Sequence, residues 1–191
     1  MTRLFLTISR DSKTVPYPPK SRNHGHQGNA GFVDLKGNRD AISRIQEATG
    51  DAALTSALTS LNDPVSPFFT IGCEHATALD EGGHVKRGYL ELAFNCSRLV
   101  RNPTNYFILF LGFDRWMHDA KVEWPVDYHW ELMSVHFSRP SVDGWTLTVW
   151  LTTSPNAGDR EGIVKLWADA MATQVSFLRG SAPPIEDPIY P

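Results

Sequence analysis

Two short stretches of the sequence place a histidine two residues before a hydroxyl side chain. They are His75-Ala76-Thr77 and His136-Phe137-Ser138. On a strand, residues two apart point to the same face, so each stretch would present an imidazole beside a hydroxyl. An imidazole can act as a general acid or base near neutral pH, and a hydroxyl can hold a substrate oxygen. The spacing therefore indicates two candidate halves of one catalytic site.

This repeated pattern resembles that of the two-histidine (2H) phosphoesterases, in which His, an apolar residue, Ser or Thr, and an apolar residue occur twice. The opening stretch RLFLTIS is also similar to the first strand of that family. The resemblance implies cleavage of cyclic nucleotides or cyclic phosphates, with His75 and His136 as acid and base and the two hydroxyls on phosphate oxygens. The second pattern departs from the family, because Arg139 follows Ser138. The other interpretation is that both histidines are structural residues, hydrogen-bonded in the core or at its rim. The sequence therefore leaves open whether the chain is an enzyme.

Carboxylates form a second set of candidates. Glu74 and Glu91 are expected directly opposite each other on a hairpin, which would destabilise the sheet unless a cation or ligand lies nearby. Asp127, His129 and Glu131 alternate along another expected strand. This row would suit a tuned general base or a bound cation, whereas an exposed strand end explains it without any site.

The strand that carries this row changes polarity midway. Its first half has polar side chains on one face, and its second half has them on the other, since Met133, Val135 and Phe137 continue the row of Asp127. Either a bulge flips the alternation or the strand passes from a covered to an exposed part of the sheet.

Trp150 is a candidate contact residue because threonines flank it in alternation. Thr146, Thr148 and Thr152 share its expected face, so a polar surface would carry one large aromatic ring. That combination suits a sugar, a base or a partner protein. The candidate binding residues are therefore Glu74, Glu91, Asp127, His129, Glu131 and Trp150.

The elements that must position these residues follow from the apolar spacing. RLFLTIS predicts a strand, and the spacing after Asn38 predicts helices that break at Gly50 and end near residue 61. Further strands are predicted at 67–79, 85–96, 105–114, 126–138 and 144–153. Their short connectors require antiparallel pairing, with one hairpin turn at Gly82-Gly83. A single apolar stripe along REGIVKLWADAMATQVSFL predicts a long C-terminal helix.

We therefore expect an α+β fold in one domain, residues 1–191, with a curved antiparallel sheet of about five to six strands. A helical region follows the first strand, and the C-terminal amphipathic helix packs on the sheet. We expect the apolar run at 105–114 to form a central strand of this sheet. Two segments lie outside this plan: a basic loop at 10–37 and a Pro-rich tail at 180–191. The loop would pack on the acidic body or dock an anionic ligand, and the tail would pack on the body or dock into a partner.

Composition narrows the function classes. The net charge of -3 gives no general attraction to nucleic acid or an anionic membrane, and no apolar stretch reaches membrane-spanning length. Cys73 and Cys96 have neither a CxxC nor a zinc-site spacing, so we expect no metal and no cofactor. The leading hypothesis is a soluble, cytoplasmic binding or interaction protein that holds a partner protein or small ligand. The alternative is the phosphodiesterase described above.

Overall fold

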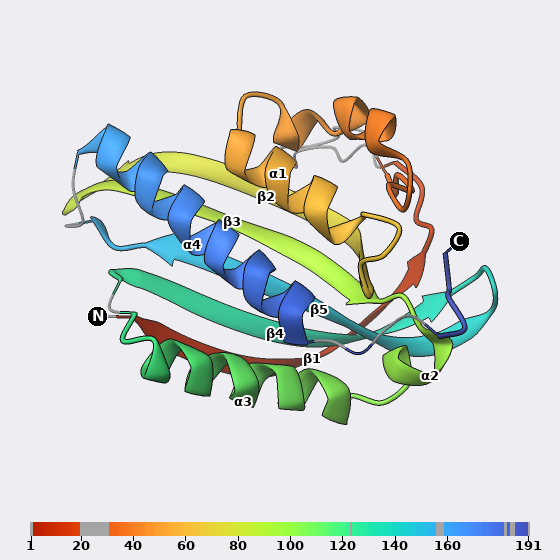
Figure 1. Ribbon diagram of the computed structural model, residues 1–191. Helices are drawn as coiled ribbons and strands as arrows, with labels where there is room; N and C mark the ends of the chain where they lie inside the picture. The colour runs from red at the N-terminus through yellow and green to blue at the C-terminus, as the bar shows by residue number, and fades with distance from the viewer. Residues whose placement is uncertain are drawn as a thin grey trace.

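The structure is a computed structural model that describes residues 2–19, 31–122, 124–155, 159–181, 183 and 186–190. Its strands form one sheet in the order β1-β4-β5-β3-β2, with β1 and β2 at the edges (Figure 1). The strands are β1 (Arg3–Val15), β2 (Phe68–Asp80), β3 (Gly83–Phe94), β4 (Val126–Phe137) and β5 (Val142–Thr153). β1 runs parallel to β4, and the other neighbours are antiparallel. The expected α+β fold is confirmed, whereas the expectation of a wholly antiparallel sheet is wrong.

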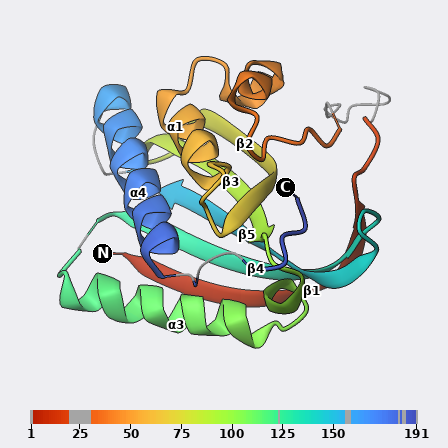
Figure 2. The same ribbon diagram turned by 45° about the vertical axis from the view of Figure 1, so that its right-hand side comes forward.

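The longer helices α1 (Ala52–Leu61), α3 (Thr104–Asp119) and α4 (Arg160–Ser181) lie on one face of this sheet. α1 and α4 run side by side, and α3 lies along β1 (Figures 1 and 2). Shorter elements are η1 (Arg39–Arg44), η2 (Gln46–Ala48) and α2 (Ser97–Val100). The helical region after the first strand and the C-terminal helix are thus confirmed. None of the described helices is long and apolar enough to cross a membrane.

Strand β4 shows how the helices and the sheet share a core. Val126, Tyr128, Trp130 and Leu132 are fully buried, and they alternate with polar residues that stay partly exposed. The Tyr128 hydroxyl donates to the carbonyl of Ala170 in α4, and the Phe113 ring of α3 packs on both Tyr128 and Trp130. Burying each large side chain stabilises the fold by roughly 2 kcal/mol. One face of the sheet is therefore closed by helices, and we call the opposite face the open face.

The stretch expected as a central strand at 105–114 is instead part of α3. Tyr106, Leu109 and Phe113 are buried at helical spacing, whereas Ile108 and Leu111 are exposed on the outer side. The side chain of Asn102 accepts a hydrogen bond from the backbone N–H of Thr104, which satisfies one of the first donors of the helix. Apolar residues on the outer side hid the helical period, and this made the run look like a strand buried on both faces.

The β2–β3 hairpin is in a different register from the expected one. Asp80 pairs with Gly83, so the turn residues are Glu81 and Gly82 rather than Gly82-Gly83. Glu74 consequently faces Tyr89, and the expected direct Glu74–Glu91 pair does not form. Because the shift is two residues, every side chain keeps the face on which it was expected.

The change of polarity along β4 does not come from a bulge in β4 itself. Its pairing with β5 is continuous from Val126 to Phe137, and the irregularity lies in β1, between Ile8 and Ser12. Phe137 is buried on the open-face side because Phe69 and the C-terminal Tyr190 pack there. The first half of β4 is therefore covered on the helix side, and its second half is covered on the open-face side.

The described parts of the two segments outside the regular plan lie on the body. Strand β1 continues to Val15, so the loop begins later than residue 10, and its residues 20–30 lie outside the described part of the chain. In the tail, Ile189 and Tyr190 are buried, and the Asn95 side chain accepts hydrogen bonds from both of their backbone N–H groups. These two residues therefore pack on the body of the protein.

We predict that Gly88→Ala destabilises the protein. An added Cβ would lie 2.8 Å from the Trp167 ring of α4 and would collide with the carbonyl oxygen of Glu74 on the neighbouring strand. Such overpacking costs on the order of 2 kcal/mol or more. Gly180→Ala is the control, because nothing lies within 4 Å of a Cβ at that helical position. Urea unfolding should show a large loss only for Gly88→Ala, and equal stabilities would contradict this packing.

Candidate functional site

All six candidate binding residues lie on the open face. Asp127, His129 and Glu131 of β4 pair there with threonines and Trp150 of β5. The pairing continues across β3 and β2 to Glu91 and Glu74. Three ranks of side chains therefore cross the sheet from β1 to β2: Arg3, Asp127, Thr152, Arg87 and Ala76; Phe5, His129, Trp150, Tyr89 and Glu74; Thr7, Glu131, Thr148, Glu91 and Gly72.

The middle rank is aromatic. Trp150 is 38% exposed although it lies on β5, the central strand of the sheet, and its ring centroid lies 4.6 Å from that of Tyr89. Phe5 is also exposed and meets the His129 ring edge-on at 6.5 Å. These rings contact their neighbours on the face but stay partly in solvent, and exposed apolar surface of this kind is a feature of binding surfaces.

The polar residues of the open face each pair with a different neighbour. His129 Nε2 lies 2.7 Å from Thr7 Oγ1, and an Asp127 carboxylate oxygen accepts from Arg3 Nε at 2.7 Å. Glu131 accepts a long bond from the Trp150 indole at 3.5 Å. Asp127, His129 and Glu131 therefore lie in a row as expected, but the two carboxylates do not contact the imidazole.

A cation lies beside Glu91, as expected for a carboxylate held within the sheet. The carboxylate is 5% exposed and forms an ion pair with Lys13 of β1, whose ammonium also lies 5.7 Å from the centre of the Tyr17 ring. Its second oxygen, Oε1, is buried and accepts no hydrogen bond from the described residues. The pair ties the C-terminal part of β1 to β3.

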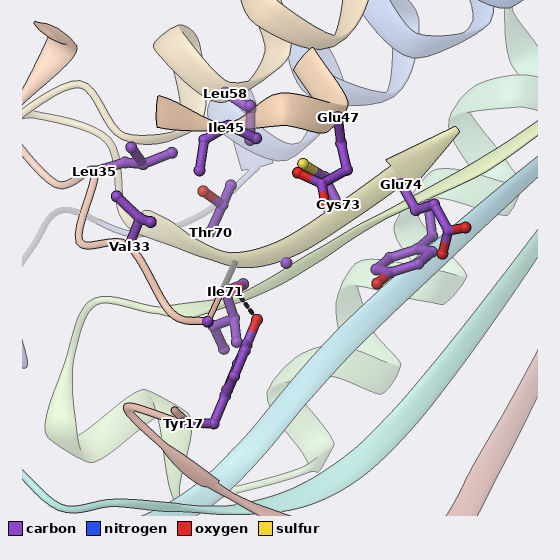
Figure 3. A pocket seen from close by; sticks show the side chains of 13 residues that line it. Tyr17, Val33, Leu35, Ile45, Glu47, Leu58, Thr70, Ile71, Cys73 and Glu74 are labelled. Carbon is purple, nitrogen blue, oxygen red and sulfur yellow. Dashed lines mark hydrogen bonds between the residues drawn. The ribbon is translucent and has the colours of Figure 1, made fainter. Parts of the chain in front are cut away.

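A pocket of about 250 Å³ lies where the open face meets the edge of β2 (Figure 3). The Tyr17 hydroxyl donates to the carbonyl of Ile71 at its floor. Glu47 reaches it from η2 and Glu74 from β2, while apolar side chains close the rest: Val33, Leu35, Ile45 and Leu58. Burial, together with the nearby carboxylates of Glu47 and Glu74, raises the pKa of the Cys73 thiol to about 12. The pocket is therefore an acidic environment with an apolar wall.

The structure does not bring the two histidine motifs together. The cross-strand pairs place His75 level with Tyr128 of β4, whereas His136 lies eight residues further along that strand. At the rise of a strand, this is on the order of 25 Å. His136 Nδ1 lies 2.7 Å from Asp143, and His75 Nδ1 lies 3.8 Å from a carboxylate oxygen of Asp51.

The hydroxyl residues of the two motifs are equally separate. Thr77 is exposed on β2, and Ser138 follows β4, where its backbone N–H donates to the carbonyl of Val15. One substrate cannot reach both pairs in this arrangement, so the geometry offers no common site for the expected acid and base.

Sequence reasoning missed several residues of the open face. Tyr89 alternates with Leu90 in a typical strand pattern, but its contact with Trp150 depends on a register that links distant strands. The contacts of Phe5 and Lys13 could not be predicted, because β1 pairs in parallel with a strand far along the chain. The alternation of β1 was the one available signal, since it places Phe5 on the face away from Leu4 and Leu6.

The chain matches no protein-family model, no curated protein and no solved structure at a significant level.

We predict that Lys13→Met lowers the free energy of unfolding by about 2 kcal/mol, because the buried Glu91 carboxylate would lose its cation. The control is Lys165→Met, which breaks the exposed pair with Asp169 on α4 and should leave stability almost unchanged. Chemical unfolding of both variants checks the difference. Equal effects would show that the Lys13–Glu91 pair adds no more than a surface contact.

Proposed function

We propose that the protein is a cytoplasmic binding protein that uses the open face of a curved sheet to hold a partner protein. The observation that carries this proposal is the aromatic rank of the open face, in which Phe5 and Trp150 are exposed and His129 and Tyr89 are half-buried. All six residues singled out from the sequence lie in or beside that rank.

The chemistry of the surface favours a protein over other occupants. Aromatic residues and arginine are enriched at the centres of protein interfaces, and Arg3 and Arg87 flank the aromatic rank here. Charges of both signs surround them, since Glu74, Asp127 and Glu131 share the face. These carboxylates would repel the phosphates of a nucleic acid.

The size of the surface supports the same conclusion. Strands spaced about 4.8 Å apart make a five-stranded sheet roughly 20 Å wide, which suits the patch that one partner buries in a stable complex. Trp150 lies near the middle of it, where hot-spot residues cluster, and truncation of a hot-spot tryptophan costs about 2 kcal/mol or more of binding energy, about thirtyfold in affinity.

The state of the cysteines supports a reducing compartment. Cys73 and Cys96 are both free in the structure. Disulfides persist in secreted proteins and are rare in the cytosol, so two free thiols fit a cytoplasmic protein. The 2H phosphodiesterase is the alternative hypothesis, and the separation of His75 from His136 gives it no support.

The test compares two tryptophans of matched exposure on different surfaces. Trp150 is 38% exposed on the open face, and Trp116 is 39% exposed on α3. A photo-crosslinking amino acid at each position, in separate variants expressed in the native cells, should capture a partner protein from position 150 alone. The captured protein is then purified, and its affinity for the wild type, Trp150→Ala and Trp116→Ala is measured.

We expect Trp150→Ala to weaken binding at least tenfold and Trp116→Ala to change it less than twofold. Both variants must first unfold at the same urea concentration as the wild type. Capture from position 116 in place of position 150, or equal affinities for all three proteins, would refute the open face as the binding surface.

A further inference from the structure

The outer edge of β2 is closed along its first part only. The backbone N–H of Thr70 donates to the Asn62 side chain at 3.0 Å, and the carbonyl of Phe68 accepts from Lys36 Nζ at 2.9 Å. The carbonyl of Ile71 accepts from the Tyr17 hydroxyl. Side chains from three other segments therefore satisfy this part of the edge, and no further strand can pair there.

The second part of the edge has no such partners. Asp80 and Gly83 close a two-residue turn, so their backbone groups bond to each other, and alternate residues of β2 turn their N–H and C=O groups away from β3. These residues are Cys73, His75, Thr77 and Leu79. Within the described part of the chain, no hydrogen bond satisfies their outward groups. Residues 76–80 are exposed, and the Leu79 side chain is 76% exposed.

The opposite edge of the sheet is protected in the way edge strands usually are. Strand β1 is interrupted between Ile8 and Ser12, and it carries Arg10 and Asp11 at that irregularity. Strand β2 beyond its own irregularity at Ile71 is regular, and Ala76 and Ala78 offer little steric hindrance. The free part of β2 is therefore the edge that can accept another strand.

Carboxylates line this free edge on both sides. Glu47 stands beside it on the helix side, and Glu74 on the open face (Figure 3). Neither forms an ion pair with a described residue, whereas the nearby Lys86 is buried against Asp51. Asp80 and Glu81 add negative charge at the end of the edge, offset in part by Arg87. An occupant must therefore satisfy backbone groups and also bring positive charge.

We propose that the free edge of β2, Gly72–Asp80, receives an extended basic segment of a partner protein as an added strand. Adjacent residues of a strand point to opposite faces, so two consecutive Lys or Arg residues would reach Glu47 on one side and Glu74 on the other. The first of these two basic side chains would occupy the pocket of about 250 Å³ that both carboxylates line. This inference goes beyond the open-face proposal and does not rest on it.

The probe is the blocked peptide Thr-Val-Lys-Lys-Val-Thr-Val, which pairs a strand-forming sequence with two consecutive lysines. Two N-methylated forms carry methyl groups on alternate residues, one on each set. Only one set of N–H groups faces β2 when the peptide is added as a strand. We expect one methylated form to lose binding at least tenfold and the other to bind like the parent peptide. A peptide with Glu in place of both lysines should not bind.

Two variants locate the site on the protein. Glu74→Lys should weaken binding of the probe at least tenfold, whereas Glu131→Lys, an equal charge change on β4 of the same face, should change it less than threefold. Thr77→Pro removes one outward N–H at an edge position where proline is tolerated, and it should also weaken binding. Trp150→Ala should bind the probe like the wild type, which separates this site from the open face.

Several results would overturn the inference. They are absence of binding at millimolar peptide, equal binding of both methylated forms, and equal effects of Glu74→Lys and Glu131→Lys. A dimer of the protein in light scattering that Thr77→Pro dissociates would show that a second copy of the chain occupies the edge instead.

Discussion

The alternation of side chains along β4 is the constraint on which the rest of the structure depends. Tyr128 and Trp130 lie under α4 and α3, and the Phe113 ring packs on both. Once these large residues are committed to the helix side, Asp127, His129 and Glu131 must lie on the other side. The open face is thus the direct counterpart of the core, and its side chains stand on a backbone that dense packing holds from behind.

A buried ion pair completes the helix side near β2. Asp51 accepts the backbone N–H of Leu54 at the start of α1 and pairs with Lys86 of β3. Burial would raise the pKa of Asp51, but the hydrogen bonds from Lys86 and Leu54 outweigh it and hold the pKa below its ordinary value. The Lys86 ammonium also lies 5.3 Å from the centre of the Trp167 ring of α4. The Lys86 ammonium therefore joins α1 and α4 to β3.

Local features were predictable from the sequence, and features that depend on distant pairing were not. Alternation placed Glu74, Asp127 and Trp150 on their correct faces, and Gly50 with Asp51 marked the start of α1. The hairpin turn was placed one residue late, since both Gly82 and Gly83 suit a tight turn. The apolar run in α3 hid its period, because exposed Ile108 and Leu111 break the usual helical pattern.

The parallel pairing of β1 with β4 had no local signal at all. It joins residues more than 120 positions apart, so neither connector length nor alternation could reveal it. The Lys13–Glu91 pair and the Phe5–His129 contact follow from that pairing and were missed with it. The six candidate residues were each found by local pattern, but only the register of the full sheet shows that they share one surface.

The most direct test of the account is hydroxyl-radical footprinting of the tryptophans in the free protein, because it reports which face of the sheet solvent reaches. Trp150 and Trp130 lie on neighbouring strands and point to opposite faces. We expect Trp150 to be oxidised at a rate close to that of Trp116, whose exposure is nearly the same, and Trp130 to be protected. Protection of Trp150 equal to that of Trp130 would contradict it, since the open face would then be covered by the chain itself.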